Sequence, residues 1–300
     1  MAKTWKKELL SIRTLQKAAS ELFGTLLLTG QICTVVTMAD VGIASLTDVA
    51  LMLFFTLTVA IYTLGPISGS HLNPAFSIQF FVFKKMSFVM MLVYVFSQII
   101  GGILGAGLSF LLIPEKWEII TRTKSVLGGN TVNDDFSLGQ GFVAEAFLTA
   151  VLTFVAWGTL VKEQEFRPFG GWAVGAVLGI GVYALGPVTG ESVNPARSFG
   201  PAVVMRTFPS DHWVFWIAPI VGALVGGAFY NFVFYKFDID FDSKKKEAEP
   251  ENVENSIQSM LSNAREQRDQ ELGNMVTSPD QPIGDNEVVI PSRKESGAEP

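Results

Sequence analysis

Charged side chains are scarce over most of this sequence. Of its 300 residues, 17% are charged, whereas a soluble domain usually carries about a quarter. The charges are also unevenly distributed, because Lys, Glu and Asp are concentrated in roughly the last sixty residues. The remainder consists of long apolar runs, which exclude an ordinary soluble domain. The formal net charge of −6 comes largely from the C-terminal tail and does not suggest a nucleic-acid partner.

Cysteine and histidine are nearly absent. The single cysteine, Cys33, lies inside an apolar run and cannot form an internal disulfide. His71 and His212 are the two histidines. Because the chain has so few nucleophilic or metal-ligating groups, and no nucleotide-binding or metal-binding motif, we expect no enzymatic activity, no cofactor and no metal site.

The apolar runs predict membrane-spanning helices. Crossing about 30 Å of hydrocarbon takes about 20 mostly apolar residues in a helix. Two runs, 75–83 and 196–205, reach only about half way across, and each begins at the alanine of an Asn-Pro-Ala triplet. The expected fold is therefore an all-α membrane protein with six transmembrane helices and two re-entrant half-helices. The six long runs are roughly 18–38, 47–65, 88–113, 141–161, 170–187 and 213–235.

Basic residues predict how the chain is oriented. They precede the first predicted span and follow the second, fourth and sixth, and the positive-inside rule assigns these segments to the cytoplasm. Both termini are then cytoplasmic, and the plasma membrane is the expected location. We divide the chain into a cytoplasmic N-terminal segment at 1–16, a membrane domain at 17–237 and a disordered acidic cytoplasmic tail at 238–300.

The tail contains two further features. A helical spacing of apolar residues predicts a short amphipathic segment, formed by Ile257, Met260, Leu261 and Ala264. Three serines are candidates for phosphorylation that would gate a pore, namely Ser243, Ser256 and Ser292.

The membrane domain contains an internal repeat. The segment GPISGSHLNPAFS at 65–77 matches GPVTGESVNPARS at 186–198, an offset of 121 residues, and a second match at an offset of 124 pairs Glu21 with Glu145. Each copy holds three spans, an odd number, so the second copy must enter the membrane inverted. Inverted repeats place functional sites near the midplane. Repeat 1 covers about 17–113, and repeat 2 covers about 141–237.

The two Asn-Pro-Ala triplets predict where the half-helices begin. Asn is a favoured N-cap, and Pro suits the first helical position. Two half-helices that enter from opposite faces bring their N-termini together, where the aligned dipoles make a positive field that repels cations. Each Asn amide can also donate a hydrogen bond to a central water, whose own hydrogens then point away and cannot readily relay a proton. The triplets are Asn73, Pro74 and Ala75 in repeat 1 and Asn194, Pro195 and Ala196 in repeat 2.

The segments before the triplets are expected to line a pore. Residues 65–72 and 186–193 are rich in Gly, Ser and Thr, and we predict that they are not helical. Irregular backbone at membrane depth is tolerated only inside protein or along a watery cavity. Their carbonyl groups would then supply a ladder of acceptors for passing water.

Two Asn-Pro-Ala triplets in matched membrane repeats resemble those of the aquaporins, the major intrinsic protein family. The resemblance covers about 15–237 and includes Glu-Leu-Phe-Gly-Thr at 21–25. It implies a homotetramer with one pore in each subunit. Such a protein passes water passively, excludes protons and ions, and serves osmoregulation.

Two carboxylates lie inside apolar spans. A charge at the positions of Glu21 and Glu145 costs several kcal/mol, so these residues act either as a proton relay or as structural braces. Their symmetry favours braces that accept hydrogen bonds from backbone N–H groups of the two re-entrant loops. We interpret His71, beside the first triplet, as a hydrogen-bonding partner of its loop rather than as a gate.

Four positions form the expected selectivity filter. Arg197 directly follows the second triplet, where its guanidinium can donate to a solute and oppose cations. By resemblance, Leu53, Val182 and Glu191 complete the constriction. Water-selective relatives have an aromatic residue and a histidine at the first two of these positions, so the apolar residues here favour a wider aperture. Glu191 stands where relatives have a small residue or a mercury-sensitive cysteine. It either pairs with Arg197 or turns outward.

Other positions favour water as the permeant. Ser198 and Ala202 stand where glycerol-conducting relatives have Asp and Arg. Our hypothesis is a passive water channel, with glycerol, urea and hydrogen peroxide as further candidate solutes. The alternatives are a glycerol or small-solute facilitator, an ion-coupled transporter, and a junctional or scaffolding protein with a closed pore.

Overall fold

The computed structural model describes residues 9, 11–161, 167–235 and 259–270, and the chain divides into two units, Met1–Asp238 and Ile239–Pro300. In the second unit, residues 259–270 are helical, with Met260 and Leu261 exposed. The rest of the expected disordered tail lies outside the described residues. The same holds for most of the predicted N-terminal segment, and for Ile257, Ser243, Ser256 and Ser292.

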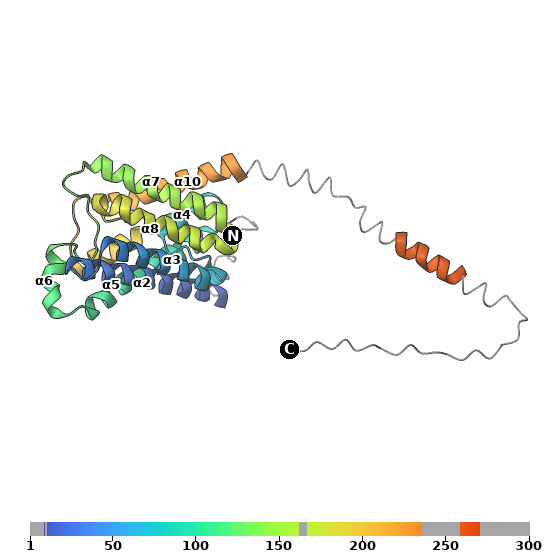
Figure 1. Cartoon of the computed structure of the whole chain (residues 1–300), viewed down its shortest axis with the longest axis horizontal. Helices are drawn as coiled ribbons and strands as arrows, with labels where there is room; N and C mark the ends of the chain where they lie inside the picture. Colours follow the sequence, from blue (N-terminus) through green and yellow to red (C-terminus); the bar gives the residue numbers. More distant parts are fainter. Residues whose placement is uncertain (1–8, 10, 162–166, 236–258, 271–300) are drawn as a thin grey trace, which may run out of the picture. The chain divides into compact units, whose positions relative to one another are not determined.

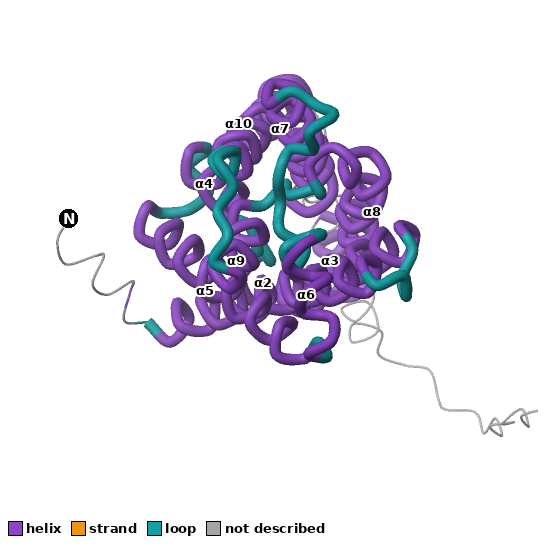
Figure 2. The backbone as a smooth tube through the Cα atoms, turned by 90° about the vertical axis from the view of Figure 1, so that its left-hand side faces the viewer, coloured by secondary structure: helices purple, strands orange, loops and turns teal. Residues whose placement is uncertain are grey.

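Six long helices dominate the described part of the first unit. All six are long and apolar enough to cross a membrane, which confirms the predicted spans. They lie side by side in Figure 1, and in Figure 2 they surround loops that cross the middle of the bundle. Turns of π-helix, Trp157–Val161 and Tyr230–Tyr235, extend the fourth and sixth helices. The helices are α2 (Ile12–Asp40), α3 (Leu46–Ser68), α5 (Phe88–Leu112), α7 (Leu138–Ala156), α8 (Gly170–Thr189) and α10 (Val214–Phe229).

Two short helices, α4 (Pro74–Val82) and α9 (Pro195–Met205), begin at the prolines of the two triplets. Asn73 caps α4 by accepting a hydrogen bond from the Ala75 N–H at 2.9 Å, and Asn194 caps α9 in the same way. The N-cap preference of Asn and the fixed φ of Pro therefore act locally, as the sequence predicts.

A further short helix, α6 (Glu115–Thr123), lies in the connection between α5 and α7. The sequence analysis did not predict it, because its polar composition is typical of a loop. An ion pair one turn apart, between Arg122 and Glu118 at 2.9 Å, supports this exposed helix.

The segments 65–72 and 186–193 were expected to be non-helical, and this prediction is wrong for the first half of each. α3 continues through Pro66 and α8 continues through Pro187, because a membrane helix tolerates proline where neighbouring structure satisfies the backbone groups that the proline frees. The helices end instead at Gly69 and Gly190. Each of these glycines has a positive φ, as is typical of a helix C-cap. Only 69–73 and 190–194 are non-helical, so the possible carbonyl ladder is shorter than predicted.

The two repeats pack their helices in the same way. α2 packs on α5, and α7 packs on α10. A Cβ atom on Gly101 of α5 would collide with the backbone of Leu22 in α2, and one on Gly222 of α10 would collide with the backbone of Ala146 in α7. Gly101 and Gly222 are equivalent positions of the repeat, so the same close backbone approach occurs in both halves.

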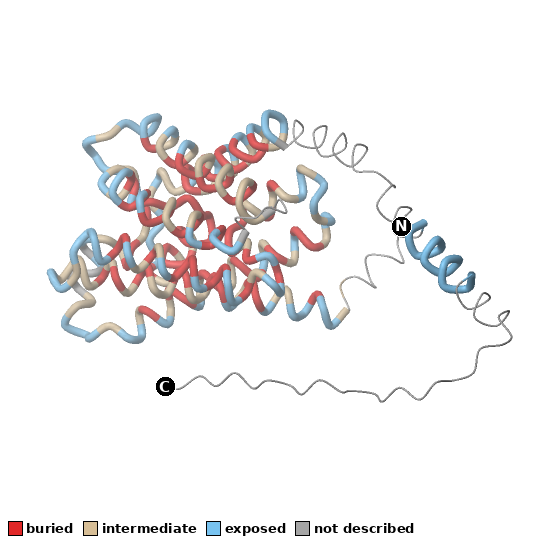
Figure 3. Tube along the Cα trace, turned by 45° about the vertical axis from the view of Figure 1, so that its right-hand side comes forward, coloured by how far each residue is buried: buried red, intermediate tan, exposed pale blue. Residues whose placement is uncertain are grey.

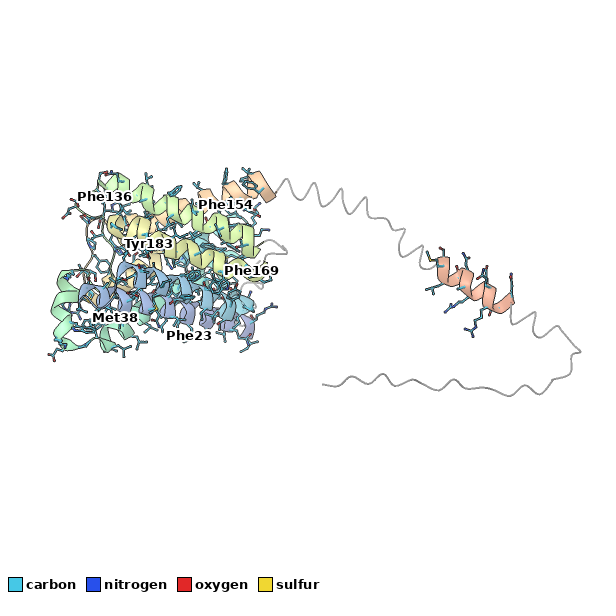
Figure 4. All side chains as sticks on the ribbon, in the orientation of Figure 1. Phe23, Met38, Phe136, Phe154, Phe169 and Tyr183 are labelled. Carbon is cyan, nitrogen blue, oxygen red and sulfur yellow. The ribbon has the colours of Figure 1, made fainter. Side chains whose placement is uncertain are left out.

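The bundle has a mixed interior and an apolar exterior, because an apolar core cluster and many polar side chains are both buried. Buried residues lie between the helices in Figure 3 and include Glu21, Glu145 and several threonines. Large apolar side chains are exposed on the outside of the bundle, among them Phe23 and Tyr183, which are labelled in Figure 4. Phe23 is 56% exposed. A soluble protein rarely exposes so many large apolar side chains together, whereas a lipid-facing surface requires them.

We predict that Gly101→Ala destabilises the protein by about 1–3 kcal/mol, because the added methyl group overpacks the α2–α5 contact. The matched control is Gly107→Ala in the same helix, where the nearest atom to the new Cβ is Val204 Cγ2 at 4.0 Å. Thermal unfolding in detergent measures both variants. Equal unfolding temperatures would show that the close approach contributes nothing.

Candidate pore

Two non-helical loops, 69–73 and 190–194, meet in the middle of the helical ring (Figure 2). The Asn73 side chain donates a hydrogen bond to the Val193 carbonyl at 2.7 Å, and the Asn194 side chain donates to the Leu72 carbonyl at 2.8 Å. The two contacts are reciprocal, so each asparagine holds the loop of the other repeat. The N-termini of α4 and α9 consequently lie next to each other.

The sequence analysis expected both asparagine amides to donate into the lumen. In the structure, each amide gives one N–H to the opposite loop. An amide nitrogen has two N–H groups, so the second remains for a passing molecule. Asn73 and Asn194 both line the same cavity, where the positive ends of two helices meet.

The loops have an unusual backbone. Four non-glycine residues at equivalent positions of the two repeats have φ values between 45° and 50°. This left-handed conformation costs roughly 1–2 kcal/mol for each residue, and for a β-branched residue it is an outlier. Strong contacts must therefore hold the loops in shape. The four residues are Ser70 and Leu72 in repeat 1 and Glu191 and Val193 in repeat 2.

Glu21 supplies such contacts to the first loop. The side chain is completely buried. Its carboxylate accepts hydrogen bonds from the backbone N–H groups of His71 at 3.0 Å and Leu72 at 2.7 Å. It also accepts from the side chains of Ser68 and Gln98. Four hydrogen-bond donors to one carboxylate offset the free-energy cost of removing its charge from water.

Glu145 makes the equivalent contacts in the second repeat. Its carboxylate is also completely buried. It accepts from the backbone N–H groups of Ser192 at 2.8 Å and Val193 at 2.7 Å, and from the Thr189 hydroxyl at 2.6 Å. With all these donors pointing at it, this carboxylate is an acceptor in a fixed network, which is the geometry of a brace rather than of an open relay.

His71 lies where its loop joins α4. Its Nδ1 atom is 3.2 Å from the Ser77 hydroxyl, and its ring packs against Phe80 and Tyr94. The residue also lines the cavity that contains Asn73. It is thus both a partner of α4 and part of the lumen wall.

Two cavities meet inside the bundle. The Asn-lined cavity, of about 290 Å³, contains Asn73 and Asn194. The loop-side cavity, of about 690 Å³, is bounded by the connection between α6 and α7 and by the end of α8. Four residues line both cavities, and we call their position the junction. The junction residues are Ile32, Leu53, Glu191 and Arg197.

The expected filter residues do not all lie at the junction. Leu53, Glu191 and Arg197 do, whereas Val182 lines only the loop-side cavity. Ile32 of α2 was not predicted, since nothing in an apolar run distinguishes a pore-lining isoleucine from a lipid-facing one.

Arg197 is fixed by backbone and amide oxygens. Its Nη1 atom donates to the Gly128 carbonyl and, at 2.5 Å, to Asn130 Oδ1, and its Nη2 atom donates to the Gly190 carbonyl at 3.1 Å. Asn130 also accepts from the Ser198 hydroxyl and donates to the Thr189 carbonyl. Gly128 and Asn130 could not be predicted from the sequence, because a polar loop gives no sign of which residues will contact an arginine about 70 positions away.

The loop that holds Arg197 is itself attached to the segment before α10. The Asp211 carboxylate accepts hydrogen bonds from the Val132 N–H at 2.5 Å and the Thr131 hydroxyl at 3.0 Å. Burial lowers the pKa of the neighbouring His212 imidazole. Among the residues that the structure describes, no cluster of three His, Cys, Asp or Glu side chains can hold a metal ion.

Glu191 does not form the ion pair with Arg197 that the sequence left open, and it lies buried beside both cavities. It is 3% exposed, and neither carboxylate oxygen has a hydrogen-bond partner among the described residues. It therefore does not pair with Arg197. Arg197 Nε is likewise without a partner within the described ranges.

Comparison with known proteins agrees with this geometry. The family model described as major intrinsic protein matches residues 8–230. The chain belongs to the major intrinsic protein family. It is 35% identical over 229 residues to nodulin-26 of Glycine max, across 76% of this chain and 81% of that protein. It is 32% identical over 236 residues to aquaporin-5 of Sus scrofa, across 77% and 85% of the two chains.

Two further proteins, one compared by sequence and one by structure, are also similar to this chain. Aquaporin-4 of Rattus norvegicus is 34% identical over 206 residues, which span 67% of this chain and 60% of that protein. The solved structure of the aquaglyceroporin from Plasmodium falciparum superposes with a TM-score of 0.65 at 24% identity, over 73% of this chain and 96% of that one. The structural match supports the fold alone. The chain is accordingly an integral membrane protein of a channel family.

We predict that Glu145→Ala severely destabilises this family member, because it leaves the buried N–H groups of Ser192 and Val193 unpaired at about 1–3 kcal/mol each. Glu145→Gln keeps one acceptor oxygen and should lose less. The measurement is thermal unfolding in detergent, together with the yield of monodisperse protein. Asp135→Ala, an exposed acid in the connection before α7, is the control. If Glu145→Ala unfolds at the wild-type temperature, Glu145 is not a brace.

Proposed function

We propose that this protein is a passive water channel that excludes protons and ions and has no enzymatic activity. The observation that supports this most directly is the junction, where two cavities meet beside a pair of asparagines at opposed helix N-termini. The membrane domain at 17–237 forms the channel, in the plasma membrane with both termini in the cytoplasm. The family's homotetramer, with one pore in each subunit, is the assembly that we propose, and osmoregulation is the role.

The electrostatics of the centre support exclusion of protons. The free N–H groups of Asn73 and Asn194 and the positive ends of α4 and α9 face the same cavity. A water molecule there turns its oxygen toward them, so it cannot pass a proton along the file. Arg197, with no carboxylate bound to it in the described part of the chain, adds a full positive charge at the junction.

A second candidate function is a facilitator for glycerol or other small neutral solutes such as urea or hydrogen peroxide. The observation that favours it is the apolar wall of the junction. Ile32 and Leu53 lie there, and neither supplies the hydrogen bonds or the bulk of an aromatic residue or a histidine. Ser198 opposes it, since its hydroxyl binds Asn130 within the network that fixes Arg197.

Stopped-flow light scattering on proteoliposomes distinguishes the two. An impermeant osmolyte measures water permeability, and parallel gradients of glycerol and urea measure solute entry. Rapid water flux with background glycerol entry supports the water channel, whereas rapid entry of both supports the facilitator. Background water flux together with background entry of glycerol and urea, from monodisperse protein, would contradict both functions and favour a closed scaffold.

We predict that Arg197→Val increases glycerol permeability about tenfold, the effect of lowering a barrier by about 1.4 kcal/mol, and introduces a proton leak. The reason is the loss of the positive charge of Arg197, which lines both cavities at the junction. Arg122→Val, in the exposed helix α6, is the control. A pH-sensitive dye inside the vesicles reports protons. Unchanged glycerol and proton entry would show that Arg197 does not select.

We also predict that water flux is insensitive to mercury. Cys33 is the single cysteine and is completely buried, whereas Glu191 occupies the junction. Glu191→Cys should make the same flux sensitive to mercuric chloride, with recovery on adding a thiol. Inhibition of the wild-type protein at low dose, relieved by thiol, would contradict this prediction.

A further inference from the structure

We propose that Gly181 is a positioning residue of the channel: it leaves a recess in α8 that holds the Glu191 carboxyl group away from Arg197 and keeps the junction open. The proposal rests on the proposed function, because it concerns how the same pore stays permeable. Gly181 was not among the predicted site residues, and it does not line either cavity.

The first observation is the position of the Glu191 side chain against α8. Its carboxyl group lies directly over the Cα of Gly181. A Cβ built on Gly181 would be 3.0 Å from Glu191 Cδ and closer still to Oε1. Real Cβ atoms do not approach other atoms so closely, so Glu191 as observed is compatible only with glycine at 181. The side chain of Leu148 forms the other wall of the recess.

The other repeat shows what happens without the recess. At the offset of 121 residues, Gly181 corresponds to Ala60 and Glu191 corresponds to Ser70. In repeat 1 the short Ser70 side chain turns back to donate a hydrogen bond to the Ala60 carbonyl at 2.8 Å. Ala60 keeps its methyl group and is 1% exposed. In repeat 1 a short loop side chain thus lies against alanine in the helix, whereas in repeat 2 a long loop side chain lies against glycine.

The alternative position of Glu191 explains why the recess affects permeation. Glu191 lines both cavities, so a side chain displaced from α8 enters the junction. Arg197 lies there with Nε unpaired among the described residues, and the two opposite charges would attract each other across the lumen. Glu145, the other acid near both, is held by its own donors. A carboxylate moved toward Arg197 would narrow the junction and cancel its positive charge.

The test is a double-mutant cycle on full-length protein in proteoliposomes, with water permeability as the readout. For Gly181→Ala we expect water permeability to fall by about tenfold, because a constricted and charge-paired junction raises the barrier to passage. In a Glu191→Ala background the same change should have no effect, since no carboxyl group remains to be displaced. Gly65→Ala in α3, where a new Cβ meets nothing within 4 Å, is the matched control.

A second arm separates Glu191 from Leu148. If the loss of flux came from a displaced Leu148, adding Leu148→Ala to Gly181→Ala would restore it and adding Glu191→Ala would not. That result, or equal flux in Gly181→Ala and wild type, would overturn the proposal. Rescue by Glu191→Ala alone supports it, and a purely structural role for Gly181 would not produce that rescue.

Thermal unfolding in detergent gives a readout that does not depend on water flux. It is measured on wild type, Gly181→Ala, Glu191→Ala and the double variant. We expect Gly181→Ala to lower the unfolding temperature by several degrees in the wild-type background and by much less with Glu191→Ala. If the wild-type protein conducts no water, the proposed function fails, while this coupling still tests the recess. If wild type conducts and positions 181 and 191 are uncoupled in both measurements, only the recess proposal fails.

Discussion

Two buried carboxylates hold the centre of this protein in shape. Glu21 and Glu145 are completely buried, and each binds backbone N–H groups of one re-entrant loop. Those N–H groups lie at membrane depth, where no bulk water replaces a missing acceptor. The loops also contain left-handed residues that ordinary chain segments avoid. The carboxylates offset both costs and so stabilise the loops that make the asparagine contacts and line the junction.

The arginine at the junction is stabilised in a different way. Carbonyl and amide oxygens of Gly128, Asn130 and Gly190 surround its guanidinium, and no carboxylate binds it within the described residues. Dipoles solvate a buried cation without neutralising it, so Arg197 keeps its full charge in the lumen. An ion pair would also stabilise the side chain, but it would neutralise the positive charge at the junction.

Much of the fold could be predicted from the sequence, because its determinants are local. Apolar length specifies the spans, and Asn-Pro specifies the starts of α4 and α9. The prediction failed where tertiary contacts decide the end of a helix, because α3 and α8 continue past Pro66 and Pro187. The network from Asn130 to Arg197 was missed for the same reason. The orientation of Glu191 depends on empty space at Gly181, which composition does not reveal, although comparing the two repeats position by position would have indicated it.

The pairing of Gly181 with Glu191 also constrains how this chain can have diverged from its relatives. A methyl group at 181 and the observed position of Glu191 exclude each other, so the conformation of Glu191 in this structure requires glycine at 181. From an Ala–Ser pair like that of the first repeat, two single substitutions lead to glycine at 181 and glutamate at 191. The order of these two substitutions therefore matters. If the methyl group is lost first, the acid enters a recess that is already there. If the acid comes first, its side chain is displaced into the junction.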